Sequence, residues 1–333
     1  MAPKRVGVIG SFVWDIIHRR DEALTGRPPI EEWGGITYAL AGFDAALPPD
    51  WQLVPLVKVG DDFAQRARDF LRTLRQVAPD AAPIAVPYPN NRVELFYRDD
   101  ERRSEILSGG VPGWSWIGLA PLLTDLDALY VNLMSGWELD LPTMQLLRQH
   151  FRGPIYCDLH SLVLGIQPDG LRTPQPLPDA VEWCRCVDIL QMNEDEMAML
   201  AHDPLALSAM ALNAGVSALC VTLGPRGVVY FAAPSFSRLA DRHAERNRGP
   251  LSLSATPGPV RTARVPGVIA RDAQGGDPTG CGDVWGATFF SRLLAGDIMT
   301  DAIHAAMNAA TKNVEHRGAT GLANHLRGEL SST

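Results

Sequence analysis

Short apolar runs alternate with longer amphipathic stretches along most of the chain. The runs are rich in Val, Ile and Leu, a composition typical of strands that are buried on both faces. We predict such strands at 5–10, 53–60, 128–133, 154–159, 187–193, 218–224 and 227–232. Because these strands alternate with helical patterns, the sequence predicts an α/β fold with a central, mainly parallel sheet and helices on both faces.

Two of the intervening stretches have clear helical spacing. Apolar residues recur on one stripe in 62–77 and again in 300–318, so both segments are predicted to form helices. Thr300 is a candidate cap for the second helix, and Gly318 is a candidate stop.

The segment 90–108 departs from this rhythm. Val93, Leu95 and Tyr97 alternate with polar residues, and the charged run "RDDERR" follows before a second apolar run. This pattern predicts a β-hairpin with one wet face, which would suit a cover over a site. A stretch from 234 to 264 is rich in Pro, Ser and Arg and is predicted to be a surface loop.

Composition narrows the class of protein. The chain has 333 residues, 46% of them hydrophobic, which is enough for a sizeable core. The net charge of -8 has no basic block within it, which argues against nucleic acid or an anionic membrane as the main partner. Five irregularly spaced cysteines predict neither a disulfide framework nor a zinc site. No apolar span of membrane length and no cleavable leader is recognisable, so we expect a soluble cytoplasmic protein.

The stretch "DPTGCGD" places flexible residues directly before an apolar helical pattern. Asp277 is a candidate cap for a helix whose first position is Pro278. Gly280 and Gly282 would let the backbone approach a ligand closely, and the amides around Cys281 would point out of the helix N-terminus. The motif therefore predicts an anion-binding site.

Asp283 is the unexpected residue of this motif, because a carboxylate repels a bound phosphate. Its presence is explained if it accepts the proton of a hydroxyl that attacks the phosphate, which indicates phosphoryl transfer. The alternative is a glycine-rich turn with a capping aspartate. Neither the Walker-type motif nor the G-x-G-x-x-G dinucleotide fingerprint occurs, so a nucleotide would have to be held differently.

The stretch resembles the D-T-x-G-A-G-D signature of the ribokinase-like (PfkB) carbohydrate kinase family. Four further segments resemble family motifs in the family's order, and together they span nearly the entire chain. These are "GSFVWD" ending at Asp15, "WGGITYALA" with Gly34 and Gly35, "NEDE" from Asn193 to Glu196, and "VTLGPRG" with Thr222, Gly224 and Gly227.

The resemblance implies a role for each matched residue. Asp283 would be the general base, and the amides of Gly280, Cys281 and Gly282 would hold the developing charge. Asp15, Gly34, Gly35, Asp158 and His160 would bind the substrate. Thr222, Gly224, Gly227, Asn193 and Asn308 would contact ATP. Asn193 and Glu196 would position Mg²⁺, largely through water, and Asp277 would serve a monovalent cation such as K⁺, as in some members.

Each of these residues also has an ordinary structural interpretation. Asp15 could be a turn or cap residue, Glu196 could serve a helix dipole, and His160 could be satisfied by a carbonyl. Asn308 is as well explained by a solvated position. We reject a nucleophilic role for Cys281, since the family has alanine there and no histidine is nearby in sequence.

Two departures from the family pattern concern the acceptor. Ala39 stands where many sugar kinases have an asparagine that binds sugar hydroxyls, and Ile36 stands where some have lysine. The substrate could then be another sugar, a sugar acid or a nucleoside, or an aromatic side chain such as Trp14, Trp33 or Tyr38 could fill the site.

The sequence thus predicts one ribokinase-like kinase domain over 1–333, with a small β lid formed by about 11–38 and 84–110. The expected activity is transfer of the ATP γ-phosphoryl group to a hydroxyl of a small sugar-like substrate. A nucleoside kinase of the same fold and an inactive sugar- or nucleotide-binding regulator are the alternatives. ATP and Mg²⁺ are the expected cofactors, a homodimer through the lid is one expected assembly, and neither nucleic acid nor membrane is an expected partner.

Overall fold

The computed structural model describes residues 2–18, 28–97, 103–234, 236–241, 259–268 and 276–329. Its strands are β1 Lys4–His18, β2 Ile30–Gly35, β3 Trp51–Gly60, β4 Ile84–Val86, β5 Asn91–Tyr97, β6 Arg103–Ser108, β7 Ala128–Asn132, β8 Ile155–Asp158, β9 Leu164–Ile166, β10 Arg172–Pro174, β11 Ile189–Asn193, β12 Ala218–Thr222, β13 Val228–Ala232 and β14 Arg261–Val265. Its α-helices are α2 Ile36–Ala46, α3 Ala64–Arg72, α4 Trp116–Leu119, α5 Leu141–His150, α6 Ala180–Arg185, α7 Glu194–Leu200, α8 Pro204–Asn213, α10 Cys281–Leu294, α11 Met299–Val314 and α12 Leu322–Arg327. Short 3-10 turns, η1 Ala120–Leu123, η2 His160–Val163 and η3 Gly224–Arg226, connect some of them.

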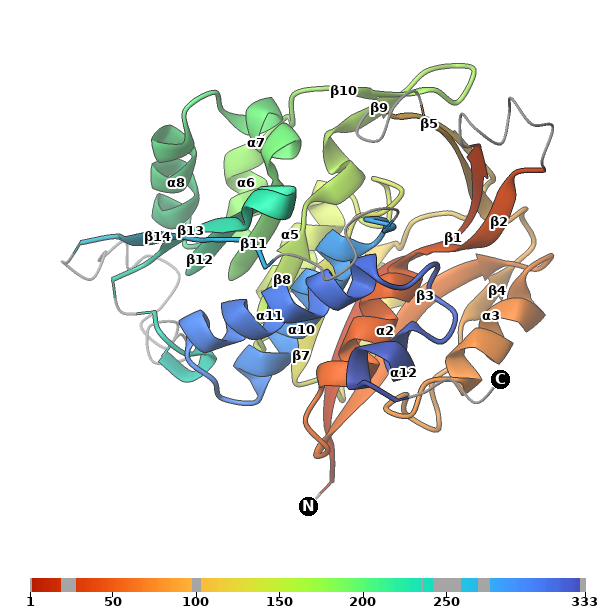
Figure 1. Ribbon diagram of the computed structural model, residues 1–333, viewed down its shortest axis with the longest axis horizontal. Coiled ribbons are helices and arrows are strands. Elements are labelled where there is room, and N and C mark those ends of the chain that lie inside the picture. Colours follow the sequence, from red (N-terminus) through yellow and green to blue (C-terminus); the bar gives the residue numbers. More distant parts are fainter. Residues whose placement is uncertain are drawn as a thin grey trace.

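A large sheet forms the centre of the molecule, in the order β14-β13-β12-β11-β8-β7-β1-β3-β4 (Figure 1). The strands from β12 to β4 run parallel to their neighbours, and β13 and β14 add an antiparallel edge. The predicted α/β class with a mainly parallel central sheet is confirmed.

Helices cover both faces of this sheet because its central strands are apolar on both sides. One face packs against α2, α3, α10, α11 and α12 in a core that contains Tyr130, Tyr156 and Phe290 (Figure 1). The other face packs against α4, α5, α6 and α8, with Leu129 and Cys157 among its buried residues. Because side chains alternate along a strand, Tyr156 and Cys157 point to opposite faces of β8.

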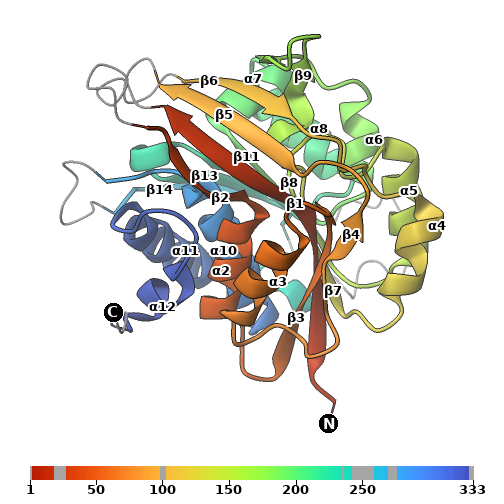
Figure 2. The same cartoon turned by 90° about the vertical axis from the view of Figure 1, so that its right-hand side faces the viewer.

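The first strand belongs to two sheets. Residues 4–11 pair with β3, and part of this stretch also pairs with β7, whereas residues 12–18 pair with β2 and β5. The strands β2, β5 and β6 together with residues 12–18 form what we call the small sheet, which rises beyond the carboxyl ends of the central strands (Figure 2). β5 and β6 form the predicted antiparallel hairpin; most of the predicted "RDDERR" turn lies outside the described residues.

Several element boundaries differ from the prediction. The first strand continues to His18. The small sheet contains fewer residues than the predicted lid segments 11–38 and 84–110, because α2 begins at Ile36 and β4 (Ile84–Val86) pairs with β3 in the large sheet. The helix predicted over 62–77 spans only Ala64–Arg72. Ile298, not Thr300, is the N-cap of α11. β14 lies partly within the predicted surface loop, much of which falls outside the described residues.

Candidate active site

Three neighbouring parallel strands each present a buried polar side chain at the same level. Asn132 on β7 is the register partner of Asp158 on β8, which in turn is the register partner of Gln191 on β11. All three side chains are buried. They form a polar row at the carboxyl end of the sheet, where open α/β sheets bind their ligands. The first turn of α10 lies against this row, because Asp283 accepts a hydrogen bond from Asn132 and the Gly282 carbonyl accepts one from Gln191.

The glycines of the predicted anion site have distinct structural reasons. Gly280 is the N-cap of α10 in a left-handed conformation (φ 74°), and a Cβ there would lie 2.1 Å from the ring of Tyr38. Gly282 presents its carbonyl to Gln191, whose Nε2 donates to it at 3.0 Å. Asp277 does not cap this helix, contrary to the prediction, because Thr279 and Gly280 form a turn and Gly280 is the N-cap of α10, which begins at Cys281. At Gly280 the backbone therefore approaches Tyr38 more closely than a side chain would permit, whereas a Cβ at Gly282 would lie 3.7 Å from Gln191, an ordinary contact distance.

Asp283 is buried in the first turn of α10. The Nδ2 of Asn132 donates a hydrogen bond to its Oδ1 at 2.6 Å, although 151 residues separate the two in the chain. Burial raises the pKa of Asp158 well above its ordinary value, and the negative charges of Glu196 and Asp283 raise it further. The site thus holds a group of carboxyls that compete for negative charge, an arrangement typical of sites that transfer protons or bind cations.

His160 follows Asp158 in the chain and has an unusual backbone. Its φ of 42° is in the left-handed region, which non-glycine residues rarely adopt. Its Nδ1 lies 2.8 Å from the hydroxyl of Ser161, so one ring nitrogen is engaged locally. The predicted pair therefore lies at the carboxyl end of β8, with Asp158 directed into the polar row and His160 at the following turn.

Asp15 lies on the part of β1 that belongs to the small sheet, and it is buried. Gly34 on β2 leaves room for its carboxylate, since a Cβ at Gly34 would lie 1.9 Å from Oδ2 of Asp15. Gly35 has a φ of 61° and ends β2 just before α2, where a Cβ would lie 2.7 Å from the carbonyl oxygen of Ser11. Gly34 therefore leaves room for the Asp15 carboxylate, and Gly35 forms the turn into α2.

Of the three aromatic residues considered for filling the site, two point away from it. Trp14 and Trp33 pack against each other and against Phe63, with ring centroids 5.1 to 5.7 Å apart. Trp14 alternates with Asp15 along β1 and so lies on the opposite face of the small sheet. Neither tryptophan therefore lies on the face of the small sheet that carries the Asp15 carboxylate.

Tyr38 is the aromatic side chain that borders the predicted site. It is buried on α2, and its hydroxyl has no hydrogen-bond partner within the described parts of the chain. Burial raises its pKa far above the ordinary value, and the charges of Glu32, Asp15, Asp277 and Asp283 raise it further. Tyr38 therefore lies between the carboxylates of the small sheet and those around the start of α10.

The N-x-x-E motif forms a capping box at the start of α7. Asn193 Oδ1 accepts from the backbone amide of Glu196 at 2.9 Å, and the Glu196 carboxylate accepts from the backbone and side-chain nitrogens of Asn193 at 2.9 and 2.7 Å. Burial raises the pKa of Glu196 to about 8, and the charge of Asp283 also raises it. Both carboxylate oxygens of Glu196 are engaged, so a metal near this motif would be reached through water.

The T-x-G-x-x-G segment forms the turn between β12 and β13. Thr222 ends β12 as the register partner of Asn193, so these two predicted nucleotide residues lie side by side. Gly224 and Gly227 have φ values of 55° and 100°. Asn308 is exposed on α11, and none of the hydrogen bonds between described residues joins it to the others. The strand register thus places Thr222 beside Asn193, and Gly224 and Gly227 follow in the adjoining turn.

The segment before α10 is tied to the end of α11. Asp277 Oδ1 accepts from the backbone amide of Thr279 at 3.0 Å, and Asn313 Nδ2 donates to the Thr279 carbonyl at 2.8 Å. Burial raises the pKa of the Cys281 thiol to about 11, so the thiol stays protonated near neutral pH. This agrees with our rejection of Cys281 as a nucleophile.

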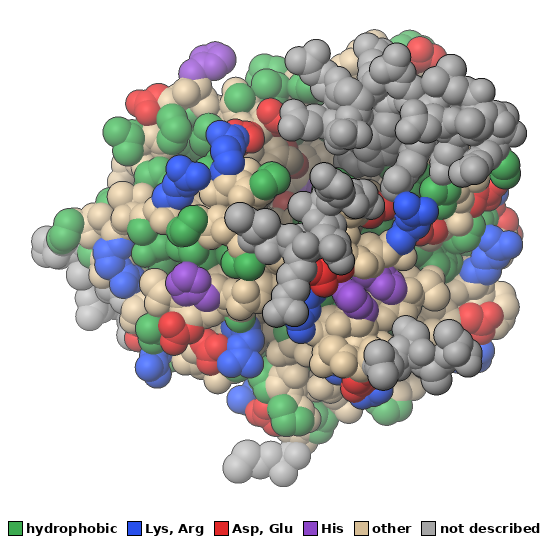
Figure 3. Space-filling model, in the orientation of Figure 1, with side chains coloured by type: hydrophobic (Ala, Val, Ile, Leu, Met, Phe, Trp, Pro, Cys, Tyr) green, Lys and Arg blue, Asp and Glu red, His purple; other side chains and the backbone are tan. Residues whose placement is uncertain are grey.

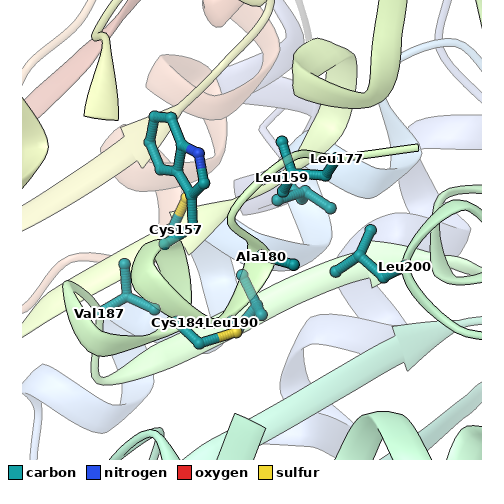
Figure 4. Close-up of a pocket in the computed structure, with 9 residues that line it drawn as sticks. Cys157, Leu159, Leu177, Ala180, Cys184, Val187, Leu190 and Leu200 are labelled. Atoms are coloured by element: carbon teal, nitrogen blue, oxygen red, sulfur yellow. The ribbon is translucent and has the colours of Figure 1, made fainter. Parts of the chain in front are cut away.

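An apolar cavity lies elsewhere in the described part of the chain. It has a volume of about 10 Å³, and Cys157, Cys184 and Leu190 are among its lining residues (Figure 4). Cys157 points to the face of β8 opposite Asp158. The cavity therefore belongs to the core between the large sheet and α4, α5, α6 and α8, and not to the site. Within the described residues, no group of three or more His, Cys, Asp or Glu side chains is arranged to hold a metal ion.

The molecular surface adds two observations. Basic and acidic side chains are interspersed over the face seen in Figure 3, without a single large basic patch. Among the described helices, none is both long enough and apolar enough to span a bilayer.

Three side chains of this site could not be identified from motifs. Asn132 and Gln191 interrupt the apolar strands "ALYVN" and "ILQMN" with buried polar residues, which was a usable signal. Tyr38 was recognisable only as an aromatic beside a Gly-Gly motif, and its contact with Gly280 depends on the tertiary fold.

Comparison with known proteins gives a match to one family model over part of the chain and a fold over nearly all of it. Residues 166–325 match the model of the pfkB family carbohydrate kinases. No curated protein matches the sequence. Ribokinase from Thermotoga maritima superposes with a TM-score of 0.65 at 16% sequence identity, covering 98% of each chain. Ribokinase from Cryptococcus neoformans var. grubii serotype A, in complex with ADP, gives 0.66 at 18% identity, covering 98% of this chain and 100% of that one.

Adenosine kinase from Sinorhizobium meliloti gives a TM-score of 0.68 at 17% identity, covering 98% of this chain and 99% of that one. At such identities the structural likeness establishes the fold alone. The resemblance to the ribokinase-like (PfkB) carbohydrate kinase family is therefore confirmed, by the family model over residues 166–325 and by a ribokinase fold over nearly the whole chain.

Proposed function

We propose that this protein is a kinase that transfers the γ-phosphoryl group of ATP to a hydroxyl group of a small sugar or sugar-like acceptor. The observation that carries the proposal is the burial of Asp283 in the first turn of α10, next to the amides that follow Gly280. A buried carboxylate at an anion-binding helix terminus has a chemical purpose if it accepts a proton during phosphoryl transfer.

In the proposed reaction, Asp283 accepts the proton of the acceptor hydroxyl as its oxygen bonds to the γ-phosphorus and the bond to ADP breaks. The backbone amides from Gly280 to Asp283 stabilise the charge that spreads over the transferred phosphoryl oxygens. The left-handed Gly280 supports this role, because it leads directly into the first turn of α10, whose leading amides have no partner within the helix; the Cys281 amide donates to the Pro278 carbonyl at 3.1 Å.

We propose that Asp15 binds hydroxyls of the acceptor, with Gly34 and Gly35 beside it and Asp158 and His160 on the opposite side. The space that Gly34 leaves for the Asp15 carboxylate supports this assignment. The small sheet would cover the bound acceptor and exclude water, which is a competing acceptor for the phosphoryl group.

The donor would lie over the ends of β11 and β12. Thr222, Gly224 and Gly227 would contact the nucleotide, and Asn308 would lie toward the adenine; the ADP complex of the fungal ribokinase supports ATP as the donor. The oxygen ligands of Asn193 and Glu196 fit Mg²⁺, reached through water because Asn193 already engages the Glu196 carboxylate. Bound there, Mg²⁺ would neutralise charge on the donor phosphates. Asp277 would serve a monovalent cation.

A nucleoside is the second candidate acceptor. The replacement of the family asparagine by the buried Ala39 favours it, as does the fold likeness to an adenosine kinase. Trp14 and Trp33 pack against Phe63 on the other face of the small sheet, so they do not support a nucleoside as the acceptor.

The test measures ADP formation from ATP and Mg²⁺ with a panel of neutral sugars, polyols, sugar acids and nucleosides. We expect one class to be phosphorylated, and we expect Asp283→Asn to reduce its turnover by about 100- to 10,000-fold without weakening ATP binding. Full activity in Asp283→Asn would exclude Asp283 as the base. If the wild type binds ATP and an acceptor in a thermal-shift assay but phosphorylates nothing, the protein is a binding regulator.

A further inference from the structure

The hydrogen bond between Asn132 and Asp283 goes beyond what the family motifs assign. We propose that Asn132 is a positioning residue, whose side-chain amide holds the Asp283 carboxylate in the orientation in which it accepts the proton of the acceptor. This inference rests on the proposed function, because it requires that Asp283 is the base.

The geometry supports a fixed orientation. Asn132 has no exposed surface, and its Nδ2 lies 2.6 Å from Oδ1 of Asp283. β7 lies between β1 and β8 in the interior of the large sheet, so ladder hydrogen bonds on both sides hold its backbone. A hydrogen-bond donor on such a strand has a fixed position. The Asn132 amide therefore fixes the direction of Oδ1 of Asp283.

The second support for Asp283 comes from Gln191. Its Nε2 donates to the carbonyl of Gly282, and its Oε1 accepts from the hydroxyl of Tyr156. A Cβ at Gly286 would lie 2.3 Å from Oε1 of Gln191, so the helix can approach only because residue 286 is glycine. Gln191 therefore fixes the backbone of the first turn of α10, whereas Asn132 fixes the Asp283 side chain.

The acidic groups around Asp283 indicate what the Asn132 amide contributes. Five acidic groups of the described elements interact electrostatically with Asp283: Tyr38, Tyr130, Asp158, Glu196 and Cys281. Each of them, when ionised, opposes the negative charge that a general base must carry. The Asn132 amide is neutral and donates its hydrogen to Asp283, so it favours the ionised carboxylate without introducing a positive charge that would bind the phosphate.

A purely structural role predicts different behaviour. If Asn132 only joins β7 to α10, its replacement lowers stability, and kcat at pH values where Asp283 is ionised stays as in wild type. If Asn132 positions the carboxylate, kcat falls at those pH values as well, beside the change in the titration of Asp283 that follows from loss of the hydrogen bond. The two roles therefore differ in measurements made on the folded protein.

The first experiment needs no knowledge of the acceptor. In protein labelled with ¹³C at the aspartate carboxyl carbons, the Asp283 signal is identified by its absence from Asp283→Asn and then followed by NMR as a function of pH. In Asn132→Leu we expect the pKa of Asp283 to rise by about one unit, since the carboxylate loses a hydrogen bond that favours its ionised form. An Asp283 titration unchanged from wild type would overturn the proposal.

The second experiment uses the acceptor identified by the panel assay. Asn132→Leu should lower kcat by about 100-fold while the KM for ATP stays within about twofold, as expected for a misplaced catalytic group. In Asn132→Asp the introduced carboxyl can donate only when protonated. Its activity relative to wild type should therefore increase as the pH falls, which a structural role does not predict. A pH profile parallel to that of wild type would contradict the proposal.

Asn90 provides a matched control, because it is also fully buried, but its side chain bonds to backbone groups, including the amide of Gly60, and not to a carboxylate of the site. Asn90→Leu should lose stability while the titration of Asp283 stays unchanged. If Asn132→Leu does not fold, Asn132→Ala removes the donor with a smaller side chain, and the same two outcomes apply. Full activity of Asp283→Asn refutes the proposed base, whereas an inactive Asp283→Asn beside a normal Asn132→Leu refutes only the positioning role.

Discussion

Replacing Gly34 by alanine tests the proposed acceptor site directly. A Cβ at Gly34 would lie 1.9, 2.2 and 2.5 Å from Oδ2, Cγ and Oδ1 of Asp15. The entire carboxyl group is in the way, so a small rotation that moves one oxygen cannot relieve the contact. The φ of Gly34 does not lie in the positive region, and alanine is therefore acceptable to the backbone. The clash with Asp15 alone decides the outcome.

The expected magnitude follows from these distances. Ordinary van der Waals contact begins near 3.4 Å, so the Asp15 carboxylate must move away by roughly 1.5 Å from its position 1.9 Å from the new Cβ. A misplacement of about 1 Å in a positioning group can cost about 100-fold in rate. Overpacking of this kind typically costs 1–3 kcal/mol in the free energy of unfolding, on the order of 2 kcal/mol here.

The assay is a double-variant cycle on Gly34→Ala, Asp15→Ala and the combination. Urea unfolding should show that Asp15→Ala restores part of the stability lost in Gly34→Ala, with a coupling free energy on the order of 1 kcal/mol. Kinetics should show a higher KM for the acceptor in each variant, with the KM for ATP unchanged and no recovery in the combination.

Two results would refute this reasoning. Strictly additive stability changes would mean that the alanine at residue 34 and the Asp15 carboxylate avoid each other at no cost. An unchanged KM for the acceptor in Gly34→Ala would mean that the position of the Asp15 carboxylate does not matter for binding. The first result concerns packing, and the second concerns the assignment of Asp15 to the acceptor.

Two further predictions concern titration and stability. Because the pKa of Glu196 is raised from 4.5 to about 8 in the folded protein, the folded state retains a proton that the unfolded state releases, and stability should fall as the pH rises through this window. Without added metal, Glu196→Gln should reduce this slope in urea unfolding midpoints from pH 5 to 9; an equal slope would contradict the shift. Asp188 is fully buried, pairs with Arg148 at 3.1 Å and accepts from a β8 amide, so Asp188→Ala should cost about 3–5 kcal/mol in urea unfolding. The exposed carboxylate of Asp69 is the control, and a similar loss in Asp69→Ala would refute the importance of burial.

The sequence predicted the large sheet well, because its strands are marked by local composition. The runs at 53–60, 128–133 and 218–224 correspond to β3, β7 and β12 within one to two residues at each end. A strand that is buried on both faces needs a continuous apolar run, and such a run is visible without any tertiary information.

Features that depend on long-range pairing were harder to predict. The first strand was predicted to end at Gly10, yet the backbone stays extended to His18 and only the pairing partners change. The start of α10 was misplaced by three residues, since Asp277 and Pro278 are favourable helix-start residues that here precede the turn formed by Thr279 and Gly280. Asn132 and Asp283 lie 151 residues apart, a distance that no local pattern reveals.

The continuity of β1 has a mechanical consequence. Residues 4–11 are clamped in the large sheet and residues 12–18 belong to the small sheet, with no loop between them. Hinged domain closure usually relies on a few loop or element-terminal residues that absorb the change in backbone angles. At this junction no such residues exist, so any displacement of the small sheet must twist or bend an intact strand. The small sheet would then behave as an elastic extension of the large one, with an opening amplitude set by the stiffness of β1.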